Sequence, residues 1–160
     1  MYKRIFEIEN KLDEGMFLFG ARQTGKSTLL KERFKDAVYY DLLNPNVRKA
    51  FKRNPNILWE ALQDKPTGTL VIVDEIQKVP ELLDVVHSLM VERGLSFILS
   101  GSSSRKLKRS GANTLGGRAI PETLYPLVWP EVTDFQIDRA VQNGMIPRHY
   151  IVENATKRLS

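Results

Sequence analysis

The chain has 160 residues, of which 42% are apolar and 27% are charged, an ordinary composition for one globular domain. This balance excludes a disordered, collagen-like or coiled-coil chain, and no apolar stretch approaches the ~20 residues that a membrane span requires. The sequence contains no cysteine, which excludes disulfides, thiolate metal sites and a cysteine nucleophile and fits a cytoplasmic location. Its net charge of +5 permits a nucleotide or a nucleic acid as partner.

Predicted strands and helices alternate along the chain. Apolar runs bounded by Gly, Pro or Asp predict strands over residues 16–19, 38–40, 69–73, 96–99 and 120–127. Apolar residues at helical spacing predict helices over residues 28–34, two short helices within 46–63, and further helices over 80–93 and 130–143. Trp59 and Trp129 are expected to be packing residues. Strands that alternate with helices require right-handed crossovers, so the sequence predicts an α/β fold with a mostly parallel sheet flanked by helices.

The loop after the first predicted strand reads G-A-R-Q-T-G-K-S, the G-x-x-x-x-G-K-S pattern of a phosphate-binding loop. Its two glycines allow the backbone to aim successive N–H groups at phosphates, and the following helix adds its N-terminal N–H groups. Lys26 is predicted to reach the β- and γ-phosphates, and Ser27 to offer its hydroxyl to Mg²⁺. The predicted nucleotide-binding residues are Gly20, Ala21, Arg22, Gln23, Thr24, Gly25, Lys26, Ser27 and Thr28. A chance glycine-rich turn is the alternative, although strand, loop and helix agree.

Acidic and hydroxyl side chains follow the next two predicted central strands. Asp74 ends a continuously apolar run at the sheet edge where ligands bind, and is predicted to hold Mg²⁺ through water. Glu75 is predicted to orient or deprotonate the water that attacks the γ-phosphate, whereas a solvated acidic turn is the alternative. Because a small-molecule kinase needs no such carboxylate, this pair favours hydrolysis. Ser100 is placed to touch the γ-phosphate or the attacking water, with Ser102 as the competing candidate and a plain turn as the alternative.

Several segments together resemble prokaryotic AAA-type ATPases. The resemblance rests on G-A-R-Q-T-G-K-S-T-L-L, L-V-I-V-D-E-I-Q-K-V-P-E-L-L, F-I-L-S-G-S-S-S-R-K-L and N-T-L-G-G-R-A. Tyr125-Pro126-Leu127 with Glu131, and Gly144-Met145-Ile146-Pro147, also look like segments of that family. Complete chains of the family continue into a winged-helix segment and a C-terminal nuclease-like domain.

The resemblance implies an AAA-like P-loop core that binds Mg-ATP and hydrolyses it to ADP and phosphate through the residues named above. Its choice of ATP over GTP agrees with the lack of an N/T-K-x-D guanine-specificity segment. We expect the ATPase core over residues 1–128 and the start of a truncated C-terminal extension over residues 129–160. The short chain is interpreted as a natural truncation, a degraded copy or a fragment, and missing lid contacts would weaken hydrolysis.

Arg118 and two basic segments are candidate contacts for the nucleotide or for a macromolecular partner. Arg118, in Gly116-Gly117-Arg118, matches the Gly-Arg of the family and is a candidate arginine finger, supplied in cis or by a neighbouring subunit of a homo-oligomer; a surface arginine is the alternative. Two basic segments, Arg105–Arg109 and 44–58, permit contact with nucleic-acid phosphates, although no aromatic residue interleaves the first. A nucleotide-dependent binding switch, on DNA for example, and a small-molecule kinase therefore stay open as alternatives, and no membrane partner is expected.

Overall fold

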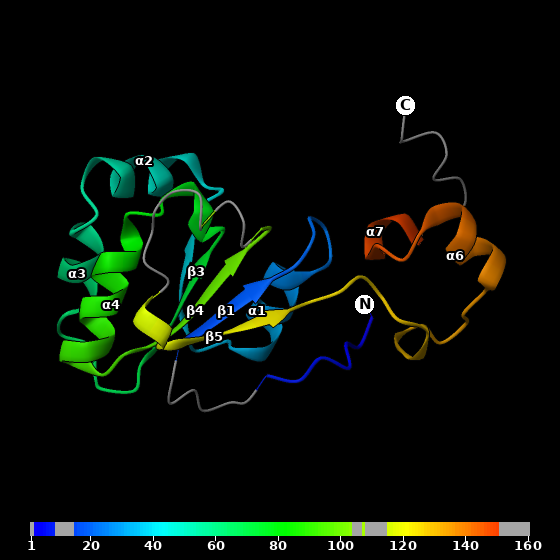
Figure 1. The fold of residues 1–160 in the computed structure, drawn as a ribbon, viewed down its shortest axis with the longest axis horizontal. Helices are drawn as coiled ribbons and strands as arrows, with labels where there is room; N and C mark the ends of the chain where they lie inside the picture. Colours follow the sequence, from blue (N-terminus) through cyan, green and yellow to red (C-terminus); the bar gives the residue numbers. More distant parts are fainter. Residues whose placement is uncertain (1, 9–14, 104–106, 108–114, 151–160) are drawn as a thin grey trace.

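A five-stranded parallel sheet organises the chain (Figure 1). The computed structural model describes residues 2–8, 15–103, 107 and 115–150. Its strands are β1 (Gly15–Phe19), β2 (Val38–Asp41), β3 (Leu70–Asp74), β4 (Ser96–Gly101) and β5 (Ala119–Thr123). The order is β2-β3-β4-β1-β5, and every neighbouring pair is parallel. The predicted α/β fold with a parallel sheet is therefore confirmed.

Helices that lie between the strands in the chain cover the sheet: α1 (Lys26–Arg33), α2 (Pro45–Arg53), α3 (Ile57–Leu62) and α4 (Leu82–Arg93). Two further helices, α6 (Ile137–Asn143) and α7 (Pro147–Tyr150), follow the last strand. Short 3-10 turns are η1 (Ile76–Lys78), η2 (Leu115–Gly117) and η3 (Trp129–Glu131). Local sequence explains the start of α2, since the Asn44 side chain accepts a hydrogen bond from the Asn46 N–H at 3.0 Å and Pro45 occupies the first turn.

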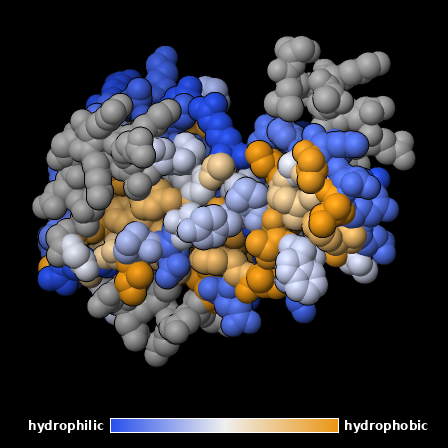
Figure 2. Space-filling model, turned by 45° about the vertical axis from the view of Figure 1, so that its right-hand side comes forward, coloured by the Kyte–Doolittle hydropathy of each residue, from blue (hydrophilic) through white to orange (hydrophobic). Residues whose placement is uncertain are grey.

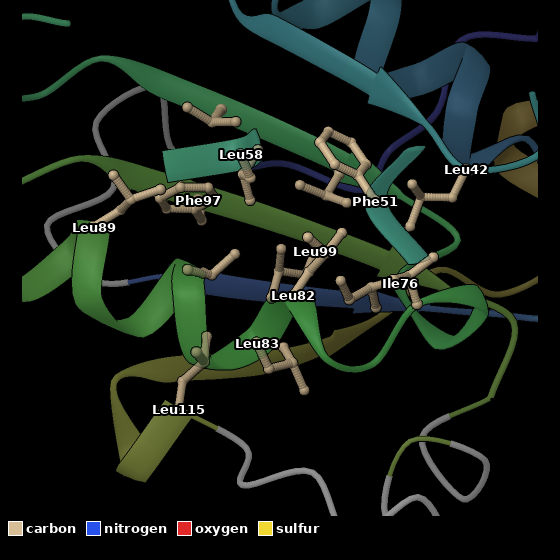
Figure 3. Close-up of a cluster of buried hydrophobic side chains, with 14 of the residues drawn as sticks. Leu42, Phe51, Leu58, Ile76, Leu82, Leu83, Leu89, Phe97, Leu99 and Leu115 are labelled. Atoms are coloured by element: carbon tan, nitrogen blue, oxygen red, sulfur yellow. The ribbon is translucent and has the colours of Figure 1, made fainter. Parts of the chain in front are cut away.

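The sheet is buried on both faces because alternate residues of each central strand point to opposite sides. One face joins α2, α3 and α4 in the larger cluster, which Figure 3 shows in part. Its buried strand residues are Phe17, Val71, Val73, Phe97 and Leu99. The other face packs against α1 through Met16, Leu18, Ile72 and Ile98. Since full burial of one such side chain contributes about 1.5–3 kcal/mol, both layers hold the loops at the strand ends in place.

The chain after β5 forms a small helical unit beside the carboxyl edge of the sheet (Figure 1). Its own cluster contains the buried residues Leu127, Val132 and Tyr150, with Tyr2 packed against it. The unit also exposes apolar side chains one helical turn apart, Ile137 and Val141, on α6, and Figure 2 shows hydrophobic surface in this region. The predicted division after residue 128 stays a prediction.

Three expectations for this region differ from the structure. β5 ends at Thr123 instead of residue 127, because the chain turns away after Leu124 and Pro126 has no N–H for a strand ladder. The last predicted helix begins at Ile137 instead of residue 130, since Trp129–Glu131 forms the separate turn η3. The expected packing role of Trp129 is wrong, because its position at the start of that turn leaves it 70% exposed.

Candidate functional site

The loop between β1 and α1 lies at the carboxyl edge of the sheet and needs glycine at two positions. A Cβ atom at Gly20 would lie 2.3 Å from the carbonyl oxygen of Leu124, so any side chain there would displace backbone. Gly25 has a φ of +94°, which L side chains rarely adopt, and immediately precedes α1. The predicted strand–loop–helix context of a phosphate-binding loop is therefore present.

Lys26 reaches back across this loop. Its ammonium donates hydrogen bonds to the carbonyl oxygens of Gly20 at 2.7 Å and Ala21 at 2.9 Å. The residue is buried, and this desolvation lowers the pKa of Lys26, while the nearby carboxylates of Glu75 and Asp74 oppose the shift. An ammonium has three N–H donors, so it can still offer one to an anionic oxygen in front of the loop.

Asp74 is the buried last residue of β3, and hydroxyl groups from both neighbouring strands hold its carboxylate. Ser100, on β4, donates a hydrogen bond to Oδ1 of Asp74, and Tyr39, on β2, donates to Oδ2 at 2.6 Å. The Glu75 backbone N–H donates to the Ser100 hydroxyl oxygen at 3.4 Å. Burial and the hydrogen bond to Asp74 raise the pKa of Tyr39 well above its ordinary value. The Asp74 carboxylate is thus oriented from two sides.

Glu75 follows β3 with a left-handed backbone, at a φ of +63°. Such a conformation costs a residue other than glycine about 1–3 kcal/mol and is typical of functional sites. The Gln77 side-chain amide donates to Oε2 of Glu75 and to the hydroxyl of Ser102 at 3.2 Å. The structure therefore gives Ser102 an indirect contact with Glu75, while Ser100 contacts Asp74 directly.

Lys26 and Glu75 border a cavity of about 560 Å³ in front of the loop. Its lining residues are Arg22, Gln23, Gly25, Lys26, Ser27, Thr28, Leu43, Glu75, Lys78, Pro147 and Arg148. Four of these side chains are basic and one is acidic, a balance that favours a polyanionic ligand. A second cavity of about 240 Å³ shares Gly25, Thr28, Pro147 and Arg148 and adds Tyr2, Arg4 and Leu29 among its lining residues.

The structure does not bring Arg118 to this cavity. Arg118 immediately precedes β5 and is exposed, and its carbonyl oxygen accepts a hydrogen bond from the Gly15 N–H at 2.8 Å. It therefore lies at the amino edge of the sheet, whereas the loop follows Phe19 at the carboxyl edge. Five residues at about 3.3 Å each separate the two edges by roughly 16 Å. This placement gives a cis arginine finger no support, and the trans alternative stays a prediction.

The two basic segments have different outcomes. Arg105–Arg109 lies outside the described residues except for Leu107. In the second segment, α2 exposes Lys49, Lys52 and Arg53. The structure therefore confirms an exposed basic helix without assigning it a ligand.

Sequence reasoning missed two side chains that support the site. Tyr39 is one, and its only sequence signal is its position near the end of a predicted strand. Arg4 is the other: its guanidinium donates to the Thr24 carbonyl in the loop at 2.6 Å, to the Tyr125 carbonyl at 2.6 Å and to Oε1 of Glu131 at 3.0 Å. Arg4 thus joins the N-terminal segment, the loop and the C-terminal unit.

The sequence matches the AAA domain family over residues 13–133. A search of curated proteins finds no match. Among solved structures, a Walker-type ATPase of Pyrococcus abyssi is similar with a TM-score of 0.59 at 16% identity, covering 91% of this chain and 63% of that one. The Orc1 protein of Aeropyrum pernix, solved in complex with DNA, is similar with a TM-score of 0.51 at 17% identity; the match covers 80% of this chain and 44% of that one. PCH-2 of C. elegans is similar with a TM-score of 0.50 at 13% identity; the match covers 74% of this chain and 37% of that one.

The solved structures are too distant in sequence to show more than the fold, and this chain spans less than two thirds of each of them. Among the residues that the structure describes, no helix is both long and apolar enough to cross a membrane. The family match, in contrast, extends over more than half of the chain and includes the phosphate-binding loop, Asp74, Glu75 and Ser100. Together with the parallel sheet, it shows that the chain belongs to the AAA domain family of P-loop ATPases.

Proposed function

We propose that this chain binds Mg-ATP and hydrolyses it to ADP and phosphate. The observation that carries the proposal is the convergence of Lys26 and Glu75 on one basic cavity, with Asp74 at the adjoining strand end. A phosphate-binding ammonium and a carboxylate that can orient water are two of the groups that phosphoanhydride hydrolysis uses.

The donor set around the loop fits a magnesium ion. Mg²⁺ prefers hard oxygen ligands and keeps several waters, and Ser27 and Asp74 offer a hydroxyl and a carboxylate. Among the described residues, no group of three His, Cys, Asp or Glu side chains could by itself hold a metal ion. When bound, the cation neutralises negative charge on the phosphate oxygens.

The residues around the cavity have different roles in the proposed reaction. Lys26 and the loop N–H groups hold the β- and γ-phosphates, and Glu75 orients a water molecule opposite the bond to be broken. The water oxygen bonds to the γ-phosphorus while the bond from that phosphorus to the β-bridging oxygen breaks, and Glu75 accepts the water proton. Lys78 and Arg148 add positive charge along the same cavity. Ser100 acts through Asp74, and any contribution from Arg118 would come from a neighbouring copy in a homo-oligomer.

The second cavity is suited to the base and ribose of the nucleotide. It adjoins the phosphate cavity through shared lining residues and adds the apolar or aromatic side chains of Tyr2 and Leu29. A flat base packs well against such side chains, whereas phosphates do not. The choice of ATP rests on membership of the AAA domain family.

A DNA-binding switch driven by nucleotide is a second candidate function. The exposed lysine and arginine side chains of α2 could neutralise phosphates, and the similar Orc1 structure is a complex with DNA. This candidate predicts DNA affinity that depends on both nucleotide and salt.

Phosphate release from Mg-ATP tests the main proposal, together with binding of a fluorescent ATP analogue. We expect Lys26→Ala to lose both binding and release. Glu75→Gln should bind the analogue but release phosphate at least about 10²-fold more slowly, the usual contribution of a general base. Glu92→Gln, an exposed change on α4, is the matched control and should behave as the parent chain. Release that persists in Glu75→Gln would refute the assigned water-orienting role, and release that persists in Lys26→Ala would refute the assigned site.

A further inference from the structure

Tyr39 occupies a position between the two predicted magnesium ligands. It lies on β2, next to β3, and its ring packs against the cluster beneath α1. The Lys31 ammonium lies 4.8 Å from the centre of that ring and covers it from the helix side. This packing fixes the ring, so the hydroxyl at its tip has a defined position near the carboxyl edge of the sheet.

The Tyr39 hydroxyl donates to Oδ2 of Asp74 at 2.6 Å, and the Ser27 side chain also lies within interaction range of it. Ser100 holds the other carboxylate oxygen, Oδ1. The two hydroxyls therefore set the rotation of the carboxylate plane. Each carboxylate oxygen has two acceptor sites, so one hydrogen bond on each still leaves acceptor capacity for a cation or its water.

We propose that Tyr39 is a positioning residue for the magnesium site, in which its hydroxyl orients the Asp74 carboxylate. The proposal rests on the proposed Mg-nucleotide function and adds a residue from the neighbouring strand. Groups that hydrogen-bond to a metal-ligating carboxylate orient it, and their loss typically lowers metal affinity 10–100-fold. Tyr39 is not among the residues that line the cavity in front of the loop, so its effect should appear through the cation.

Tyr39→Phe tests the proposal because it removes the hydroxyl and keeps the ring. The matched control is Tyr40→Phe, one residue further on the same strand, whose ring packs against Phe51 in the other cluster. The affinity for a fluorescent ATP analogue is measured in EDTA and across a Mg²⁺ titration. We expect Tyr39→Phe to need about 10-fold more Mg²⁺ for half-maximal binding, with unchanged affinity in EDTA, and Tyr40→Phe to match the parent.

A double-mutant cycle with Asp74→Asn adds a second test. Because Tyr39 is proposed to act through the Asp74 carboxylate, Tyr39→Phe should add no further magnesium dependence in the Asp74→Asn background. An equal loss of affinity with and without Mg²⁺, an unchanged Mg²⁺ requirement, or a lower requirement would each overturn the positioning role. A parent chain that does not bind the nucleotide at all would instead overturn the proposed function.

Discussion

The ion pair between Arg4 and Glu131 gives a sharp test of how the fold supports the loop. Only 9% of the Arg4 side chain and 1% of the Glu131 side chain are exposed, and their Nε and Oε1 atoms lie 3.0 Å apart. Glu131 also accepts hydrogen bonds from the backbone N–H groups of Ile5 at 2.9 Å and Val128 at 3.1 Å. One carboxylate therefore satisfies three donors from two distant parts of the chain.

Replacement of Glu131 by alanine leaves a buried guanidinium without its counter-ion and two backbone donors without their acceptor. Removal of one partner from a buried pair costs about 3–5 kcal/mol. Near the transition midpoint, each kcal/mol shifts the Tm of a chain of this size by about 2–4 °C, so we expect Glu131→Ala to unfold about 6–20 °C earlier. Glu131→Gln keeps one acceptor oxygen and should cost less, about 2–3 kcal/mol.

Thermal and urea unfolding of the parent, Arg4→Met, Glu131→Ala and the double variant measure this cost. Because the double variant has no unpaired buried charge, its destabilisation should be smaller than the sum of the two single changes by at least about 1 kcal/mol. The exposed change Glu92→Gln should stay within about 0.5 kcal/mol of the parent. Additive single effects, or a Glu131→Ala cost below about 1 kcal/mol, would refute the claim that this pair holds the N-terminal segment and the C-terminal unit together.

Three further predictions concern the loop, the core and alkaline pH. Gly20→Ala should weaken binding of the ATP analogue about 10-fold or more, because its Cβ atom would meet the Leu124 carbonyl at 2.3 Å. Gly68→Ala is the control: its φ of +80° makes alanine strained there as well, but its Cβ atom would meet no atom within 4 Å, so stability should fall while affinity stays unchanged. Phe97→Ala should lower the free energy of unfolding by about 3–5 kcal/mol in urea, and a cost below 1 kcal/mol would contradict its full burial. Burial raises the pKa of Tyr40 above 10.0, so the unfolded chain ionises first and stability falls as pH rises from 10 through the raised value. Between pH 9 and 11, the free energy of unfolding of Tyr40→Phe should fall less steeply with pH than that of the parent chain. An identical pH dependence in the two proteins would contradict the raised pKa of Tyr40.

Most of the fold was predictable because its signals are contiguous in the chain. Alternating strands and helices, the continuously apolar run before Asp74 and the spacing of Gly20, Gly25 and Lys26 are each read within a short window. Backbone sterics and the burial of apolar side chains act over the same short distances, so local pattern and local structure agree. The family resemblance added ATP, but it could not place side chains in space.

Only the tertiary structure decided which distant side chains meet. The sheet order sets β2 beside β3, which brings Tyr39 to Asp74, and the path after β5 returns Glu131 to Arg4. The same order sends Arg118 to the edge opposite the loop, although its local motif matches the Gly-Arg of the family and made it a candidate arginine finger. The local sequence pattern specifies that a strand forms and which of its faces is buried. Which neighbouring strand it pairs with depends on the packing of the whole chain. The pairing of the strands therefore determined which side chains surround the candidate site.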